Sequence, residues 1–279
     1  MRHISFIILS FFMLFSIGCG SGGLTGLAEG ILYPFESVDK KYPVPENPPE
    51  GLEQTYTEIV GHDGTPITVH AWIHDTGSNR NPTLVFFHGN GTNLQVLQIS
   101  GFLDVLRQLK FNFVVMDYPG LGRSTGTPNQ PNLWNAGKKM VEYAHNRFRR
   151  SRLIIWGRSL GAAVASQVGY TEQPYADGLI LTSPWFSFLT LALEKTGLAK
   201  NLPEEWLALH GWNSAEAVKD IKLKTMIHHG NKDTLIPFKF GQMLFEAFTQ
   251  TTPNFIELDG VGHNDVFSSQ QFWNDIKGF

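Results

Sequence analysis

Residues 153–165 read LIIWGRSLGAAVA, and this stretch decides the fold. The four apolar residues at 153–156 predict a short strand buried on both faces. The small residues at 161–165 predict a helix that packs closely against it. Between them, residues 157–161 (GRSLG) form a G-x-S-x-G pattern, whose glycines let the strand and helix backbones approach each other. A buried strand that passes directly into a helix is typical of a parallel sheet.

Apolar strands and amphipathic helices alternate along the rest of the chain. A hairpin is predicted from residues 55–60 and 67–73. Buried strands are predicted at 83–87, 113–116, 153–156, 179–182, 226–229 and 255–258, and helices at 94–109, 133–148, 160–168, 238–248 and from about 270. We therefore expect an α/β fold with a mostly parallel central sheet, an antiparallel N-terminal hairpin, helices on both faces and a short helical, cap-like insertion at 183–222.

The composition limits what the chain can do. It has 279 residues, 42% of them apolar, with 22 Lys and Arg against 25 Asp and Glu and a single cysteine. These values suit one α/β domain, which we place at 51–279, and the lack of basic blocks argues against nucleic acid as a partner. One cysteine cannot build a thiolate metal site, and the adjacent strand residues His228 and His229 face opposite ways. The sequence therefore predicts no metal and no cofactor.

The N-terminus has the pattern of an export signal. Arg2 precedes an apolar run at 4–17, which is shorter than a membrane-spanning helix, and small residues lead to Cys19. We expect residues 1–18 to be a bacterial lipoprotein signal peptide, with Cys19 lipidated and the protein exported and anchored to the cell-envelope membrane. The alternatives are a short uncleaved anchor, or an ordinary cleaved signal that gives a periplasmic or secreted protein. Residues 19–50, rich in glycine and then in proline, predict a flexible tether and an extended segment.

The G-x-S-x-G pattern occurs twice, at 122–126 and at 157–161. A nucleophilic serine in this pattern stands on a sharp turn between a strand and the next helix. Residues 157–161 meet that requirement. Residues 122–126 follow no adjoining strand and lead to a proline at 128 instead of a helix. We therefore assign the nucleophile to Ser159 and interpret Ser124 as a loop serine.

Loops after two later strands hold the partners that a nucleophilic serine needs. A base must remove the serine proton, and a carboxylate must orient that base. Asp233 follows the predicted strand at 226–229, and His263 follows the one at 255–258, which gives the chain order serine, acid, histidine. Asp259 and Asp265 are fallback acids.

Two backbone N–H groups are candidates for an oxyanion hole. The N–H of Leu160 lies at the start of the helix after Ser159, and the N–H of Asn90 lies in the glycine-rich loop after the strand at 83–87. Trp185 and Phe186, directly after the strand at 179–182, are candidates for a substrate pocket. Most other apolar residues of the insertion are expected to pack it onto the sheet.

These motifs together resemble those of the α/β-hydrolases, and within them the BEM46-like and ABHD13/ABHD17-like branch of single-domain serine hydrolases. The resemblance covers residues 30–279 and is carried by five motifs: FHGN at 87–90, DYPGLGRS at 117–124, GRSLG at 157–161, GNKD at 230–233 and GHND at 262–265. It implies the α/β-hydrolase fold and acyl hydrolysis, since members cleave esters, thioesters or amides.

The function expected from the sequence is hydrolysis of an acyl bond through an acyl-enzyme on Ser159. The substrate would be a small molecule or an acyl group joined by an ester or thioester bond, with an amide as a further option. Such an enzyme would be a carboxylesterase, an acyl-protein thioesterase or a lipase-like enzyme. Two alternatives stay open: an acyltransferase that uses the same triad, and a non-catalytic binding lipoprotein anchored in the envelope.

Overall fold

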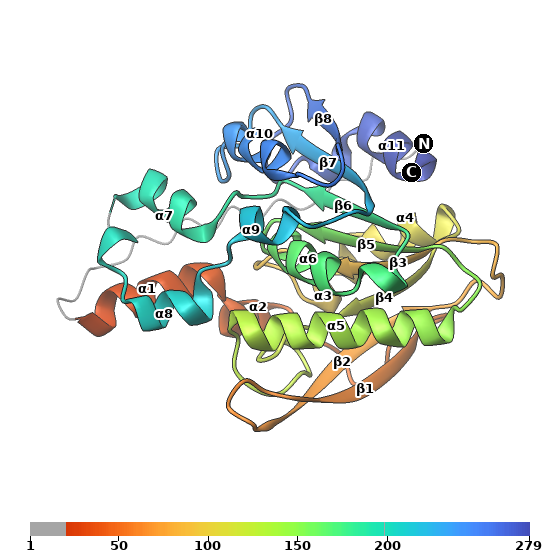
Figure 1. Ribbon diagram of the computed structural model, residues 1–279. Helices are drawn as coiled ribbons and strands as arrows, with labels where there is room; N and C mark the ends of the chain where they lie inside the picture. The colour runs from red at the N-terminus through yellow and green to blue at the C-terminus, as the bar shows by residue number, and fades with distance from the viewer. Residues whose placement is uncertain (1–20, 198) are drawn as a thin grey trace.

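A computed structural model describes residues 21–197 and 199–279, in which one sheet is covered by helices (Figure 1). The sheet has eight strands in the order β1-β2-β4-β3-β5-β6-β7-β8. The strands are β1 (Glu53–Val60), β2 (Pro66–His74), β3 (Thr83–Phe87), β4 (Asn112–Met116), β5 (Leu153–Arg158), β6 (Gly178–Thr182), β7 (Lys224–Gly230) and β8 (Asn254–Leu258).

The strand directions confirm the predicted fold class. β2 pairs antiparallel with β1 and with β4, and every other pair is parallel. The hairpin therefore lies at one edge of a parallel sheet. Because parallel strands all end at the same edge, the loops that follow β3, β5, β7 and β8 meet there.

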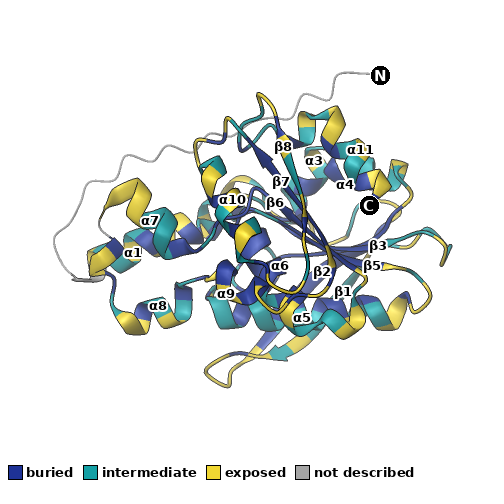
Figure 2. Cartoon of the chain, turned by 45° about the horizontal axis from the view of Figure 1, so that its top comes forward, coloured by how far each residue is buried: buried dark blue, intermediate teal, exposed yellow. Residues whose placement is uncertain are grey.

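Helices cover both faces because the central strands are apolar on both sides. In β5, Leu153 and Ile155 belong to one buried cluster, and Ile154 and Trp156 belong to the other. The helices are α1 (Ser21–Leu32), α2 (Phe35–Lys41), α3 (Leu94–Ile99), α4 (Phe102–Gln108), α5 (Gln130–Arg147), α6 (Leu160–Thr171), α7 (Phe188–Thr196), α8 (Glu204–His210), α9 (Ser214–Val218), α10 (Phe238–Ala247) and α11 (Gln270–Gly278). The first cluster holds residues of α5, α6, α9 and α10, and the second holds residues of α3, α4 and α11. Figure 2 shows the buried sheet between these two layers.

One predicted helix is two helices. The sequence predicts a continuous helix at 94–109, but α3 ends before Ser100 and α4 begins after Gly101. Gly101 has a φ of 77°, a left-handed conformation that ends the first helix and redirects the chain. Apolar spacing resumes in α4, which hides the break from a reading of periodicity.

The prediction of a tether and an extended segment at 19–50 is wrong for residues 21–41, which are mostly helical, whereas residues 42–50 form neither helix nor strand. Residues Ser21–Leu32 form α1, and residues Phe35–Lys41 form α2. Leu32, Phe35 and Val38 are buried in the main core, so tertiary packing outweighs the weak helix preference of the glycines. The predicted signal peptide and Cys19 lie outside the described residues. No helix in the described ranges is both long and apolar enough to cross a membrane.

The insertion after β6 is helical, as expected. It contains α7, α8 and α9, with a short 3-10 turn at Ala199–Asn201. α7 and α8 extend from the sheet beside α1, at the left of Figure 1. The Lys195 ammonium of α7 donates a hydrogen bond to the carbonyl of Thr234, which connects the insertion to the loop that carries Asp233.

Candidate active site

Ser159 stands on a strained turn between β5 and α6. Its φ is 57° and its ψ is −121°, a conformation that side-chain-bearing residues rarely adopt. A Cβ on Gly157 would lie 2.0 Å from the carbonyl oxygen of Gly161, and a Cβ on Gly161 would lie 1.9 Å from that of Phe87. Both positions therefore require glycine, which is the physical reason for the G-x-S-x-G pattern.

Ser159, His263 and Asp233 form one hydrogen-bonded chain. His263 Nε2 is 3.1 Å from Ser159 Oγ, and His263 Nδ1 is 2.6 Å from Asp233 Oδ2. The other carboxylate oxygen, Oδ1, accepts hydrogen bonds from the N–H groups of Leu235 at 2.9 Å and Ile236 at 2.8 Å. All three side chains are buried, so water does not compete for these bonds. The three residues come from the loops after β5, β7 and β8.

The surroundings favour a charged Asp233 and a neutral His263. Burial opposes the charge on Asp233, but hydrogen bonds from His229 and His263 outweigh it and hold the pKa of Asp233 well below its usual value. Burial lowers the pKa of His263; the hydrogen bond to Asp233 opposes this shift, and the positive charge of Arg158 adds to it. A neutral imidazole that is oriented by a carboxylate can accept a proton from Ser159 Oγ.

The predicted oxyanion-hole donors belong to segments next to Ser159. Leu160 is the first residue of α6, where the N–H groups have no partner within the helix. The loop after β3 also lies near Ser159, because a Cβ on Gly89 would lie 3.6 Å from Ser159 Cβ. In the described part of the chain, neither the Leu160 N–H nor the Asn90 N–H forms a backbone–backbone hydrogen bond.

Arg158, directly before Ser159, was not predicted from the sequence as a site residue. Its Nη2 donates to the carbonyl oxygen of His263 at 2.7 Å and to Asn264 Oδ1 at 3.0 Å. The guanidinium also lies 5.3 Å from the ring centroid of Phe267. Burial lowers the pKa of Arg158 to about 10, so the side chain stays charged at neutral pH. Arg158 therefore holds the loop that carries His263. The signal available in the sequence was the charge of Arg158, which lies among apolar and small residues at 153–165.

His229 is a second residue whose place the sequence did not indicate. Its Nε2 donates to the carbonyl oxygen of Ile236 at 2.8 Å and is 3.5 Å from Asp233 Oδ2. His228 contacts a different element, with its Nε2 3.3 Å from Asp275 Oδ2 of α11. The two rings thus face opposite ways, as expected from their adjacent strand positions. In the described ranges, no group of three His, Cys, Asp or Glu residues could hold a metal ion.

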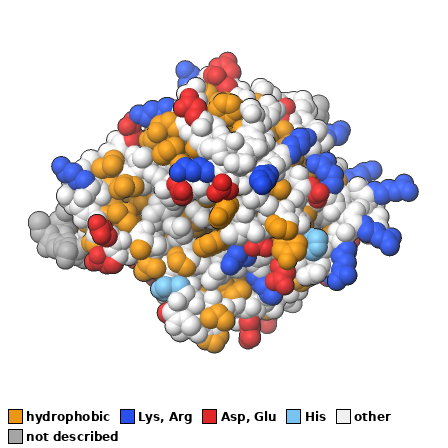
Figure 3. All heavy atoms as spheres, in the orientation of Figure 1, with side chains coloured by type: hydrophobic (Ala, Val, Ile, Leu, Met, Phe, Trp, Pro, Cys, Tyr) orange, Lys and Arg blue, Asp and Glu red, His pale blue; other side chains and the backbone are white. Residues whose placement is uncertain are grey.

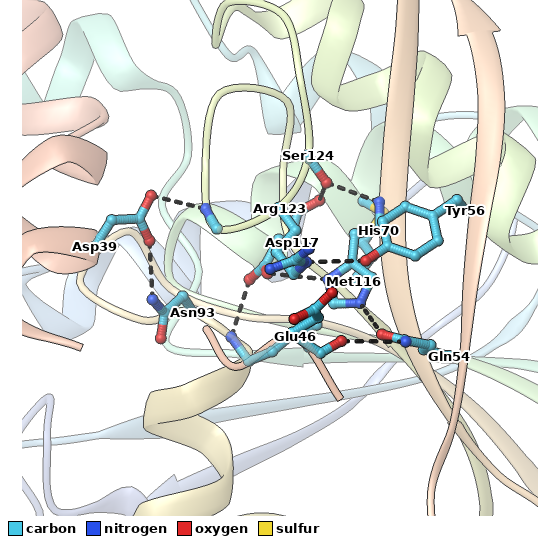
Figure 4. Close-up of polar contacts among 12 residues, drawn as sticks. Asp39, Glu46, Gln54, Tyr56, His70, Asn93, Met116, Asp117, Arg123 and Ser124 are labelled. Atoms are coloured by element: carbon cyan, nitrogen blue, oxygen red, sulfur yellow. Dashed lines mark hydrogen bonds and ion pairs between the residues drawn. The ribbon is translucent and has the colours of Figure 1, made fainter. Parts of the chain in front are cut away.

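Ser124, in the first G-x-S-x-G match, lies in a different network (Figure 4). Its Oγ donates to the carbonyl oxygen of Asp117 at 2.8 Å and accepts from the N–H of His70 at 2.8 Å. The hydroxyl proton is therefore used within the loop and is not directed to a base. This geometry is that of a loop serine which joins the 117–126 loop to β2.

The predicted pocket residues lie on the segment between β6 and α7. Trp185 is 5% exposed and packs edge-on against Phe188, with 6.3 Å between the ring centroids. Phe186 is half-buried, and its carbonyl accepts a hydrogen bond from the N–H of Ala215 at 3.0 Å. These contacts fix the insertion to the domain, and a contact of either residue with substrate stays a prediction. Figure 3 shows further hydrophobic side chains at the surface around α7 and α8.

Known proteins share this fold and parts of this sequence. A protein family described as serine aminopeptidase, S33, matches residues 78–208. The chain is 24% identical to the α/β-hydrolase domain-containing protein WAV2 of Arabidopsis thaliana, with 91% of this chain and 90% of that protein covered. It is 23% identical to protein bem46 of Schizosaccharomyces pombe, with 94% and 91% covered. The esterase Pf2001 of Pyrococcus furiosus has a TM-score of 0.65 at 20% identity, with 85% of this chain and 96% of that chain covered.

The chain therefore has the α/β-hydrolase fold, which it shares with the esterase Pf2001. Its sequence is similar to that of protein bem46, and its motifs resemble those of the BEM46-like branch.

Proposed function

We propose that the protein is a serine hydrolase that cleaves a carboxylic ester or thioester bond through an acyl-enzyme on Ser159. One observation carries this proposal: the continuous hydrogen-bonded chain from Ser159 Oγ through His263 to Asp233, with distances of 3.1 and 2.6 Å. The similarity to an esterase of the same fold agrees with it.

The reaction follows from the roles that this geometry permits. Ser159 Oγ attacks the substrate carbonyl carbon while His263 Nε2 takes the hydroxyl proton. The carbonyl oxygen becomes negative and accepts hydrogen bonds from the N–H groups of Leu160 and Asn90. His263 then gives its proton to the leaving alcohol or thiol, and the acyl group stays on Ser159. A water molecule, deprotonated by His263, attacks the acyl-enzyme; the acid leaves and Ser159 recovers its proton.

An uncharged acyl group is the favoured substrate class. Aromatic and aliphatic side chains dominate the insertion. Some of the hydrophobic side chains near α7 and α8 lie at the surface (Figure 3). A panel of p-nitrophenyl esters of increasing chain length tests this part of the proposal. We expect activity to persist beyond the acetate, and a strict preference for acetate would contradict an apolar acyl site.

Covalent labelling with a fluorophosphonate probe tests the nucleophile. Wild-type protein and Ser124→Ala should be labelled, whereas Ser159→Ala should not. Labelling that survives Ser159→Ala would overturn the assignment. A folded wild-type protein that is neither labelled nor active on esters would favour the binding-lipoprotein alternative. Transfer of the acyl group to an added alcohol in preference to water would favour the acyltransferase alternative.

We also propose that the protein acts at the cell-envelope membrane, attached through a lipid on Cys19. The support is the apolar run at 4–17 and the small residues that precede Cys19. Expression of wild type and Cys19→Ala with radiolabelled palmitate tests the attachment. Incorporation that needs Cys19, together with partition into the detergent phase, is the expected result. Equal behaviour of the two proteins would leave the cleaved signal or the uncleaved anchor as the explanation.

A further inference from the structure

Residues 29–42, called the N-terminal segment below, contact the loop after β3 at two points. Asn90 Nδ2 donates to the carbonyl oxygen of Ile31 at 2.6 Å. Three residues later, Asn93 Nδ2 donates to Asp39 Oδ1 at 2.9 Å and to the carbonyl oxygen of Tyr42 at 2.7 Å. Figure 4 shows Asp39 reaching across to Asn93. Both ends of the loop that carries the predicted oxyanion-hole donor are therefore attached to residues 31–42.

The contact between Ile31 and Asn90 satisfies a need on each side. The carbonyl of Ile31 is one of the last four in α1, which have no acceptor role within their own helix. Asn90 is flanked by Gly89 and Gly91, so the loop backbone has wide conformational freedom. A hydrogen bond from the Asn90 side chain therefore restrains the direction of the Asn90 N–H.

The N-terminal segment is itself fixed to the cap-like insertion. Trp206 Nε1 donates to Glu29 Oε1 at 2.7 Å, and Trp212 Nε1 donates to the Tyr33 hydroxyl at 2.8 Å. Trp206 belongs to α8, and Trp212 lies between α8 and α9. Trp212 and Tyr33 are buried, which keeps water away from the bond between them, and Trp206 is buried as well. Because the N-terminal segment is fixed to the insertion, the Ile31 carbonyl has a defined position. It can therefore restrain the Asn90 side chain, which a carbonyl on a flexible tether could not do.

We propose that residues 29–42 are a positioning element of the active site, which aims the Asn90 N–H at the developing oxyanion by holding the Asn90 side chain. This inference rests on the proposed acyl-enzyme chemistry of Ser159. Oxyanion-hole donors act on the charge that forms in the transition state, so their direction affects catalysis more than substrate binding. Loosening the contact should lower kcat and leave KM nearly unchanged.

The main test compares Asn90→Ala with Asn90→Gln and with Asn135→Ala. Asn135 is a matched control on α5, whose Nδ2 donates to the carbonyl of Val60 in β1 at 3.4 Å. We expect Asn90→Ala to lower kcat on a p-nitrophenyl ester about 10- to 100-fold, with KM changed by no more than about threefold. Fluorophosphonate labelling should slow by a similar factor, because the phosphonyl oxygen occupies the same hole. Asn90→Gln keeps an amide donor and should recover part of the rate, and thermal midpoints should match that of Asn135→Ala.

Asp39→Ala separates positioning from a direct role of the Asn90 amide, because Asp39 bonds to Asn93 and to the N–H of Gly122 and, among the described residues, forms no hydrogen bond with Asn90. A kcat loss of about 3- to 10-fold at unchanged KM is expected. The inference is overturned if Asn90→Ala keeps kcat within about twofold of wild type, if Asn135→Ala loses as much, or if Asp39→Ala leaves kcat unchanged. Failure of the wild-type protein itself to be labelled would count against the proposed function instead.

Discussion

Replacing Arg158 by methionine is expected to slow ester hydrolysis without touching the triad. The guanidinium makes two hydrogen bonds, at 2.7 Å to the carbonyl of His263 and at 3.0 Å to Asn264. Methionine fills much of the same volume but offers no donor and no charge. The substitution therefore releases the loop that carries His263 and removes a positive charge beside its imidazole.

The structure sets the size and the sign of the effect. Loss of hydrogen bonds from a charged donor should lower the free energy of unfolding by about 2–3 kcal/mol. A displacement of His263 by about 1 Å would reduce kcat/KM about 10- to 100-fold. The proposed mechanism needs a neutral His263, so kcat/KM should rise with pH through the pKa of this residue. Arg158 lowers that pKa; without the charge the pKa rises, and the acid limb of the profile moves to higher pH.

A pH profile of kcat/KM on a p-nitrophenyl ester checks both effects, and Arg158→Lys separates them. Lysine keeps the charge, so the acid limb should stay near that of wild type, but its shorter side chain should still lower the rate. Wild-type kcat/KM in Arg158→Met, or an acid limb that stays in place or moves to lower pH, would contradict the role assigned to Arg158.

Three further substitutions test the nucleophile turn, the acid and the loop serine. Gly161→Ala would place a Cβ 1.9 Å from the Phe87 carbonyl oxygen. We expect the free energy of unfolding to fall by at least about 1–3 kcal/mol. The control Gly278→Ala, with open space at its Cβ, should unfold like wild type. Asp233→Asn should lower kcat by about 10⁴-fold with little change in thermal midpoint, and a loss under tenfold would argue against the assigned acid. Ser124→Ala leaves the buried N–H of His70 without its acceptor, so stability should fall by about 1–3 kcal/mol while fluorophosphonate labelling persists.

The nucleophile turn was predictable because its constraints are local. A strand, two glycines and a helix follow one another within 153–165. A Cβ on either glycine would lie about 2 Å from a backbone carbonyl oxygen, so both positions require glycine. Asp233 and His263 were predictable for a related reason. Each follows its own strand, and the parallel sheet brings strand ends to one edge without any further information.

The N-terminal segment could not be predicted in this way. Its glycines and prolines indicate a flexible tether and an extended chain, and they carry no sign of partners far along the sequence. α1 and α2 are instead stabilised by contacts with Asn90, Asn93 and the tryptophans of the insertion. Arg158 was missed for the opposite reason. It lies inside a recognised motif, but its partners at 263 and 264 are more than one hundred residues away.

Backbone hydrogen bonds at the ends of the strands hold the strained residue Ser159 in place. Hydrogen bonding continues one residue beyond the ends of the strands: the N–H of Ser159 donates to Thr182, and the N–H of Ser183 donates to His228. Ser159 and Ser183 both have positive φ, at 57° and 48°, directly after neighbouring strands. Each such residue costs about 1–3 kcal/mol and persists only where its surroundings fix it. The ladder bonds supply that restraint, so the strain at Ser159 is held by the sheet, while Arg158 and residues 29–42 act on the loops around it.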